Sequence, residues 1–187
     1  MGVKAESESF YAGGIIFDKL TASQVLSDSP VYAIAQDYYG YMWFGTRGGV
    51  YRYDGVKIIE FRDISNSTIW AICEDSQGSL WVGMEYGLNR FHRQTETSVS
   101  YLHNPADPNS ISDNFTWAIY EDSQSTLWIG TENGLNTFNH ETGAFTSYLH
   151  DDADPNSISG SAIHTIYEDG RHPLGGDKGR HQLHRCR

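Results

Sequence analysis

Two sets of residues carry side chains that could perform chemistry, a histidine and cysteine group near the end of the chain and a series of aspartates. The first set is His172, His181, His184 and Cys186. A zinc site needs paired ligands held by a defined turn or helix, and this stretch has neither a hydrophobic pattern nor paired cysteines. We therefore expect no metal site, and the sequence points to no other cofactor.

The aspartates recur at regular positions. They are Asp37, Asp75, Asp122 and Asp169; the first three precede Trp43, Trp81 and Trp128 by six residues, whereas Gly175 stands six residues after the fourth. A catalytic acid acts once in a site, whereas a residue present in every unit is typical of a turn. We expect these aspartates to be structural. Because no nucleophile has a base beside it, we predict no catalytic residue and no enzyme.

The aspartates mark an internal repeat with steps of 38, 47 and 47 residues. Residues 69–115 align with residues 116–162 without a gap and are identical at 27 of 47 positions. Chance composition does not give such an identity, so the chain contains a duplication, and a repeat architecture is expected.

Each unit is predicted to form four short strands, because runs rich in apolar and aromatic residues alternate with turn residues. The first strands are expected at 31–36, 69–74, 117–121 and 162–168, the second at 41–46, 80–84 and 127–131, a third at 88–91, and the fourth at 57–61, 98–102 and 145–149. An Asp-x-x-Gly turn joins the first two strands. In the third unit Ser125 replaces the glycine, so we expect a strained turn there.

A glycine follows each tryptophan by two residues, at Gly45, Gly83 and Gly130. A glycine inside a strand indicates close approach of another backbone, and the tryptophans are expected to anchor the core between units. Four antiparallel strands per repeat of about 40–50 residues are typical of a propeller blade. We predict an all-β partial β-propeller of three four-stranded blades, at about 31–61, 69–102 and 116–149, plus the start of a fourth at 162–169.

Three phrases of the chain resemble the two-component regulator propeller repeat, which is found in the sensor regions of bacterial hybrid histidine kinases. They are VYAIAQDYYGYMWFGTRGGVYRYDG (31–55), AICEDSQGSLWVGMEYGLNRF (71–91) and AIYEDSQSTLWIGTENGLNTF (118–138). The links HNPADPNSIS and HDDADPNSIS are similar to the inter-blade connection of that family. The resemblance covers about residues 15–169 and implies an N-terminal fragment of a sensor outside the cytoplasmic membrane, with the membrane helix and kinase elsewhere. Departures are Met84, where the other units have threonine, and the short link after Phe61.

Propellers bind ligands at loops around one end of the central channel. If the first strands are innermost, the turns after the second strands share a rim with the long links. The candidate ligand-binding residues in these turns are Arg47, Glu85, Tyr86, Glu132 and Asn133, and those in the links are Asn109, Ser110, Asn156 and Ser157. Such side chains suit a sugar or a peptide. Alternatively, Asn-Ser-Ile-Ser shapes each link while its isoleucine packs inward, and His103 and His150 are solvated loop residues.

The charge of the chain limits its partners. It has 13 Lys and Arg against 24 Asp and Glu, a net charge of −11, which disfavours nucleic acid. There is no apolar run of about 18 residues for a membrane helix and no signal peptide at the start. We predict a non-catalytic, ligand-sensing segment that binds a carbohydrate or another small extracytoplasmic ligand and contacts neighbouring propeller or sensor domains. The alternatives are a propeller enzyme of the streptogramin-lyase type and a structural interaction scaffold.

The two ends of the chain carry separate predictions. Residues 1–14 are expected to be flexible, and residues 15–20, without a turn-linked partner, to be the strand that closes the last blade of a complete ring. An incomplete ring has an open edge, so we expect the isolated chain to aggregate or to form oligomers.

Residues 170–187 form a basic tail that holds five of the 13 positive charges. It is either a polyanion-binding arm or the product of a frameshift. Permitted codons for the tail, read one base later, give AGTLWVGTKGGINCIDA, which reproduces the second and third strands of the repeat. We therefore predict an aberrant tail, and a coding sequence without this motif in either alternative frame would contradict the prediction.

Overall fold

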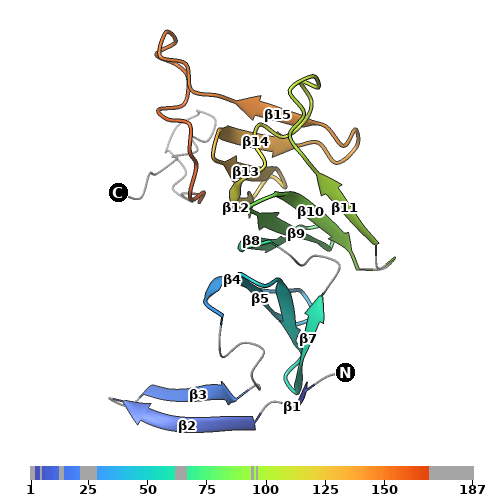
Figure 1. The fold of residues 1–187 in the computed structure, drawn as a ribbon, viewed down its shortest axis with the longest axis vertical. Coiled ribbons are helices and arrows are strands. Elements are labelled where there is room, and N and C mark those ends of the chain that lie inside the picture. Colours follow the sequence, from blue (N-terminus) through green and yellow to red (C-terminus); the bar gives the residue numbers. More distant parts are fainter. Residues whose placement is uncertain are drawn as a thin grey trace.

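Figure 1 shows the computed structural model of the chain, which describes residues 3–4, 6–12, 15–21, 29–61, 67–93, 95 and 97–168. These residues form β-strands joined by turns and links, and no helix occurs among them. The strands follow one another as antiparallel neighbours in successive sheets, as the repeat predicts.

Three sheets correspond to the three repeat units. Blade one is β4 (Val31–Gln36), β5 (Met42–Thr46), β6 (Val50–Tyr53) and β7 (Lys57–Phe61); blade two is β8 (Ile69–Glu74), β9 (Ser79–Met84), β10 (Gly87–His92) and β11 (Thr97–Tyr101); blade three is β12 (Thr116–Glu121), β13 (Leu127–Thr131), β14 (Gly134–Phe138) and β15 (Phe145–Tyr148). A short strand, β1 (Val3–Lys4), extends blade one beyond β7. The predicted all-β partial propeller is confirmed.

The first strands of the blades lie closest to one another. Strand β8 contacts both β4 and β12, whereas β7, β11 and β15 lie toward the outside (Figure 1). The first strands are therefore innermost, as the predicted rim requires.

In each of the three blades, the repeated aspartate joins its turn to its tryptophan. In blade two, Asp75 Oδ2 accepts a hydrogen bond of 2.7 Å from Trp81 Nε1, and Asp75 Oδ1 accepts from the backbone N–H groups of Gln77 and Ser79. Blades one and three repeat this pattern, with carboxylate–indole distances of 2.7 and 2.8 Å. The turn role is confirmed, and the bond to the indole adds a function that the spacing alone did not suggest.

The backbone angles of the Asp turns show where strain is present. Gly40 and Gly78 have φ angles of 84° and 77°, and Ser125 at the equivalent position of blade three has a φ of 60°. A side chain with a Cβ atom is disfavoured in this left-handed region, so the strained turn predicted at Ser125 is present.

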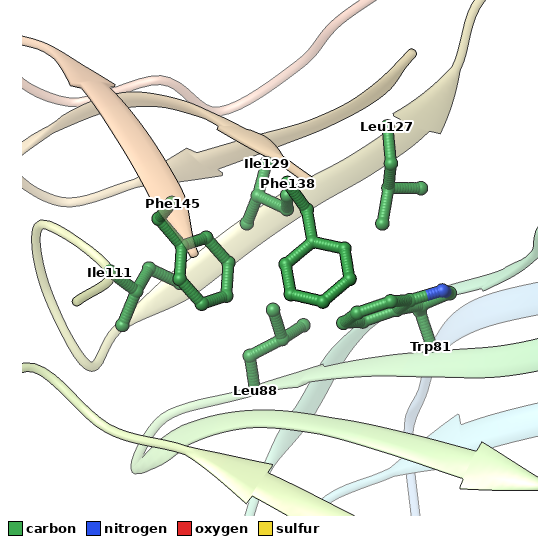
Figure 2. Packing of buried hydrophobic residues seen from close by; sticks show 7 residues of the cluster. All are labelled: Trp81, Leu88, Ile111, Leu127, Ile129, Phe138 and Phe145. Atoms are coloured by element: carbon green, nitrogen blue, oxygen red, sulfur yellow. The ribbon is translucent and has the colours of Figure 1, made fainter. Parts of the chain in front are cut away.

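The tryptophans pack between blades. Figure 2 shows Trp81 and Leu88 of blade two facing Leu127, Ile129 and Phe138 of blade three. Phe145 and the link residue Ile111 complete this cluster, and Trp43 occupies the equivalent place between blades one and two. Trp43 and Trp81 are almost fully buried, whereas Trp128, on the far side of blade three, is only partly buried. The predicted anchoring role is correct for the first two tryptophans.

The strand glycines permit this close packing. A Cβ atom at Gly45 would lie 2.6 Å from Ile69 Cγ2, and one at Gly83 would lie 2.7 Å from Thr116 Cγ2. At Gly130 the nearest atom, at 2.5 Å, would be the backbone oxygen of Ile163. In each case the neighbour belongs to the segment that begins the next unit, so the glycines mark the approach of successive blades.

A glutamate precedes Asp75, Asp122 and Asp169, and each of these glutamates fastens its unit to the preceding blade. Glu121 accepts hydrogen bonds from the backbone N–H and hydroxyl of Ser76, at 2.7 and 2.8 Å, and Glu168 accepts the same pair from Ser123, at 2.9 and 2.6 Å. Glu74 likewise accepts from the backbone N–H of Tyr38. We call these three contacts the glutamate clamps. The hydrogen bonds from Ser123 hold the pKa of Glu168 below its ordinary value.

Residues 161–168 lie where the first strand of a fourth blade would begin. Gly134 N–H donates to the oxygen of Ser161, Ile163 N–H donates to the oxygen of Thr131, and Glu168 completes the third clamp. No ladder partner is present among the described residues, and no strand is assigned here. The start of a fourth blade at 162–169 remains a prediction that these contacts support, and the predicted aberrant tail lies outside the described residues.

The N-terminal segment differs from the expectation. Strand β2 (Glu6–Ala12) pairs with β3 (Ile15–Thr21) in antiparallel register from Glu6 opposite Thr21 to Ala12 opposite Ile15. Residues 6–12 are therefore ordered as a strand, and the strand at 15–21 does have a turn-linked partner. The Gly-Gly sequence between them is a hairpin signal that favours this local pairing. A closing role for residues 15–20 in a complete ring stays a prediction.

The glycine contacts predict a specific cost. Gly83→Ala should lower the free energy of unfolding by about 1–3 kcal/mol, because the added methyl group forces blades two and three apart. Gly48→Ala is the control, because its Cβ atom would meet nothing closer than 3.8 Å. Urea denaturation measures both variants, and equal stabilities would contradict the proposed role of Gly83.

The Asp37 carboxylate predicts acid sensitivity. Burial raises its pKa, but hydrogen bonds from Trp43, Arg93 and the Tyr41 backbone outweigh burial, so the pKa lies below the ordinary 3.8. A lowered pKa stabilises the fold above pH 3.8, and this contribution disappears as the pH falls through the folded-state pKa. The stability difference between the unaltered chain and Asp37→Asn should therefore be constant from pH 5 to 7 and shrink below pH 4. Urea unfolding at each pH tests this, and a pH-independent difference would refute it.

Candidate ligand site at the inner rim

One position of the repeat is aromatic in all four units. Tyr32, Trp70, Trp117 and His164 each lie five residues before a repeated aspartate. The ring centroids of successive members are 4.8 Å apart in all three pairs, Tyr32 with Trp70, Trp70 with Trp117, and Trp117 with His164. We call these four side chains the aromatic row.

The row follows from the position of its members in the fold. Tyr32, Trp70 and Trp117 are each the second residue of a first strand, and these strands lie side by side, so equivalent side chains meet across the blades. Phe115 adds a further ring, 4.2 Å from Trp117 between centroids. This row was not predicted from the sequence, although an aromatic residue at the same place in every unit was a visible signal.

Parts of the row remain accessible. Tyr32 is 41% exposed, His164 is exposed, and Trp70 and Trp117 are partly buried. The indole N–H of Trp70 is buried and has no hydrogen-bond partner in the part of the chain that the structure describes. Rings with accessible surface are suited to stacking against a flat molecule.

The row lies beside the predicted rim. The pairs Val31 with Thr46 and Thr116 with Thr131 place the start of each first strand next to the end of the second strand, where the candidate turn begins. Trp117 Nε1 donates a hydrogen bond of 2.7 Å to Glu132 Oε2. One predicted rim residue is therefore in direct contact with the row.

The other predicted residues occupy equivalent turns. Arg47, Tyr86 and Asn133 are exposed, and Glu85 is partly buried. Asn133 lines a hollow of about 520 Å³ together with the link residues Asn109 and Ser110. The predicted meeting of turn and link is therefore present in blade three, and ligand binding by these residues stays a prediction.

The links are held by their own side chains. Ser110 Oγ and Ser157 Oγ each bond to the backbone at the start of their link, and Ile111 is fully buried. These contacts fit the alternative in which the links are shaped structurally.

The two link histidines are exposed, and they also hold backbone contacts. The Nδ1 atoms of His103 and His150 lie 2.8 and 2.6 Å from the backbone oxygens of Ile111 and Ile158. The contact with Ile158, followed by the one with Asp152, raises the pKa of His150. Each histidine thus closes a link, a role beyond that of a solvated residue.

The described residues offer little reactive chemistry. No group of three His, Cys, Asp or Glu converges among them as a metal site would require. Burial raises the pKa of Cys73 to about 11, so its thiol is protonated at neutral pH and is a poor nucleophile. No helix in the described ranges is long and apolar enough to cross a membrane. Stacking, hydrogen bonding and ion pairing with Arg47, Glu85 or Glu132 are the interactions that this rim can offer to a ligand.

Comparison with known proteins gives matches in sequence and in structure. The family described as two component regulator propeller matches residues 25–48, 63–86 and 110–133. The extracellular domain of a hybrid two component system from B. thetaiotaomicron is 26% identical, with a TM-score of 0.64 over 76% of this chain and 21% of that one. No curated protein gives a significant match.

Two further structures share the fold. A second extracellular domain of a hybrid two component system from B. thetaiotaomicron is 21% identical, with a TM-score of 0.67 over 84% of this chain and 21% of that one. Virginiamycin B lyase from Staphylococcus aureus is 20% identical, with a TM-score of 0.58 over 82% of this chain and 49% of the lyase. The present chain spans about a fifth of the two extracellular domains.

The matched stretches coincide with the repeating structure. Each stretch includes the first two strands of one blade and ends in or beside the following rim turn. The three matches thus correspond one to one with the three blades. The chain therefore carries three two-component regulator propeller repeats, and its blades are arranged as in the extracellular domain of a hybrid two component system.

Proposed function

We propose that this chain is a non-catalytic, ligand-sensing segment of a two-component sensor, and that the aromatic row and rim turns form its ligand site. The observation that carries the proposal is the row itself, which brings aromatic side chains of all four repeat units together beside a predicted rim residue. The 26% identical neighbour, described as an extracellular domain, supports an extracytoplasmic location for the parent protein.

The chemistry of the rim favours a ligand with both flat apolar and polar surfaces. The rings of Trp70 and Trp117 offer stacking surfaces, and the exposed Tyr86, Glu132 and Asn133 provide hydrogen-bonding groups nearby. A carbohydrate, or another small ligand with hydroxyl groups, combines these features.

A ligand on the row would touch more than one blade. Trp70 lies between Tyr32 and Trp117, so a molecule covering these rings contacts three successive units. Binding that prefers one relative packing of the blades would shift the population toward that packing. Neighbouring propeller or sensor domains would then receive the change through their contacts with the blades.

An enzyme of the streptogramin-lyase type is the second candidate, because virginiamycin B lyase shares the fold. At 20% identity this likeness concerns the fold alone. A structural interaction scaffold is the third candidate. Turnover of a bound compound would favour the enzyme, and binding without turnover favours the sensor.

The aromatic row predicts the effect of removing one ring. The full chain is screened with a panel of neutral oligosaccharides by thermal shift, and calorimetry measures the affinity for each hit. Trp117→Ala should weaken that affinity at least tenfold, because it removes the ring between Trp70 and His164. Trp117→Phe should restore part of the affinity, since it keeps an aromatic ring.

Tyr148→Ala is the matched control, because it removes an exposed ring from the outer strand of the same blade. Its affinity should equal that of the unaltered chain. Hits that bind Trp117→Ala as tightly as the unaltered chain would refute the site, and chemical conversion of a hit would refute the non-catalytic role.

A further inference from the structure

The first Asp turn departs from the other two in its side chains. Blade one has Tyr38 and Tyr39 where blade two has Ser-Gln and blade three has Ser-Gln. The aspartate nevertheless accepts the same backbone hydrogen bonds in blade one, from Tyr39 and Tyr41, as its equivalents do in the other blades. The turn therefore does not need tyrosine at either position.

The two tyrosines are also unusually accessible. Tyr38 is 89% exposed and Tyr39 is 66% exposed, and their rings meet edge to face with centroids 5.6 Å apart. Adjacent exposed aromatic side chains that the turn does not require are typical of a binding surface.

A hollow of about 820 Å³ lies beside this pair. It is lined by both tyrosines, by Gln77 of the next turn, and by Glu74, His92 and Arg93 of blade two. The Asp turns follow the C-terminal ends of the first strands, whereas the aromatic row is near their N-terminal ends. The hollow is therefore separate from the proposed rim site and independent of its function. Its volume falls within the range of small-molecule sites.

The lining of the hollow is electronegative. Arg93 Nη2 is 2.8 Å from Asp37 Oδ2 and 3.2 Å from Glu74 Oε1, so two carboxylates face one guanidinium. Asp75 has Arg90 at 4.0 Å, and Glu121 accepts hydrogen bonds from Ser76. Of these groups, three carboxylates (Glu74, Asp75 and Glu121) and one guanidinium (Arg93) belong to residues that line the hollow, and the whole chain carries a net charge of −11. This balance favours a cation and opposes an anion.

The structure already shows guanidinium groups stacked on Tyr39 and on the neighbouring Tyr41. The Cζ atom of Arg93 lies 4.9 Å from the centroid of Tyr39, and that of Arg52 lies 4.7 Å from the centroid of Tyr41. One guanidinium covers only one face of a ring, and no guanidinium stacks on Tyr38 among the residues that the structure describes. Aromatic faces in an electronegative hollow attract organic cations.

We propose that this hollow binds an organic cation, an ammonium or guanidinium group that stacks on Tyr38 and Tyr39. The cation belongs either to a free small molecule or to a lysine or arginine side chain of a peptide. The volume leaves room for groups beyond the charged one.

The test uses the full chain, and its double variant takes the residues that blades two and three carry at the same turn positions. Calorimetry measures binding of arginine amide and of the peptide Gly-Gly-Arg-Gly-Gly, together with the same peptide containing citrulline, the neutral isostere of arginine. We expect the arginine probes to bind and the citrulline peptide to bind at least tenfold more weakly. The double variant Tyr38→Ser with Tyr39→Gln should reduce arginine binding at least fivefold, at unchanged net charge.

The controls separate this site from general attraction to an acidic protein. Tyr148→Ser, which removes an exposed tyrosine elsewhere, should bind the arginine probes as the unaltered chain does. The double variant should fold, because blades two and three already carry Ser-Gln in this turn. Thermal unfolding verifies that it does. Tighter binding of the arginine peptide than of arginine amide indicates a peptide source, and the reverse indicates a free cation. Equal binding by the double variant, equal binding of citrulline, or no binding of either arginine probe would overturn the proposal.

Discussion

In each of the three blades, the structure depends on the hydrogen bond between the repeated aspartate and its tryptophan. It joins a buried carboxylate to an indole N–H at 2.7–2.8 Å, while the second carboxylate oxygen holds the turn. A buried indole N–H without an acceptor would be costly, and so would a buried carboxylate without donors. The six-residue spacing satisfies both groups at once, and it places the tryptophan ring where the next blade packs.

The contacts between blades depend on this local arrangement. The glycine two residues after the tryptophan leaves space for the first strand of the next unit, and the glutamate clamp binds the backbone just after the aspartate. Turn, core and clamp therefore share a few adjacent residues. A blade in this protein is fastened at both its turn and its glycine to the blade that follows, so neighbouring blades stabilise one another.

The features predicted from the sequence are those encoded within one unit. Strand positions, the Asp turns and the strained Ser125 follow from local residue types, and the fit at Gly83 follows from a glycine in a strand. The aromatic row and the glutamate clamps were not predicted, because each joins side chains or backbone groups of different units. Glu168, for example, is 45 residues from Ser123. In the candidate rim, the contact of Glu132 with Trp117 and the hollow at Asn133 lie at the predicted turns. The neighbours of each ring in the aromatic row were not predicted, because they depend on how the first strands of different units meet.

The similarity of blades two and three has a consequence for folding. Their interfaces use equivalent residues, and 27 of 47 aligned positions are the same, so a strand that docks one whole unit out of place still finds a tryptophan, a glycine and a clamp that fit. Discrimination rests on the 20 aligned positions that differ, such as Met84 against Thr131 and Ile69 against Thr116. Mispairing between equivalent strands, within one chain or between two chains, is the characteristic error of such repeats. The hydrogen bonds that hold each blade so regularly are thus also those that make a displaced blade difficult to distinguish from a correct one.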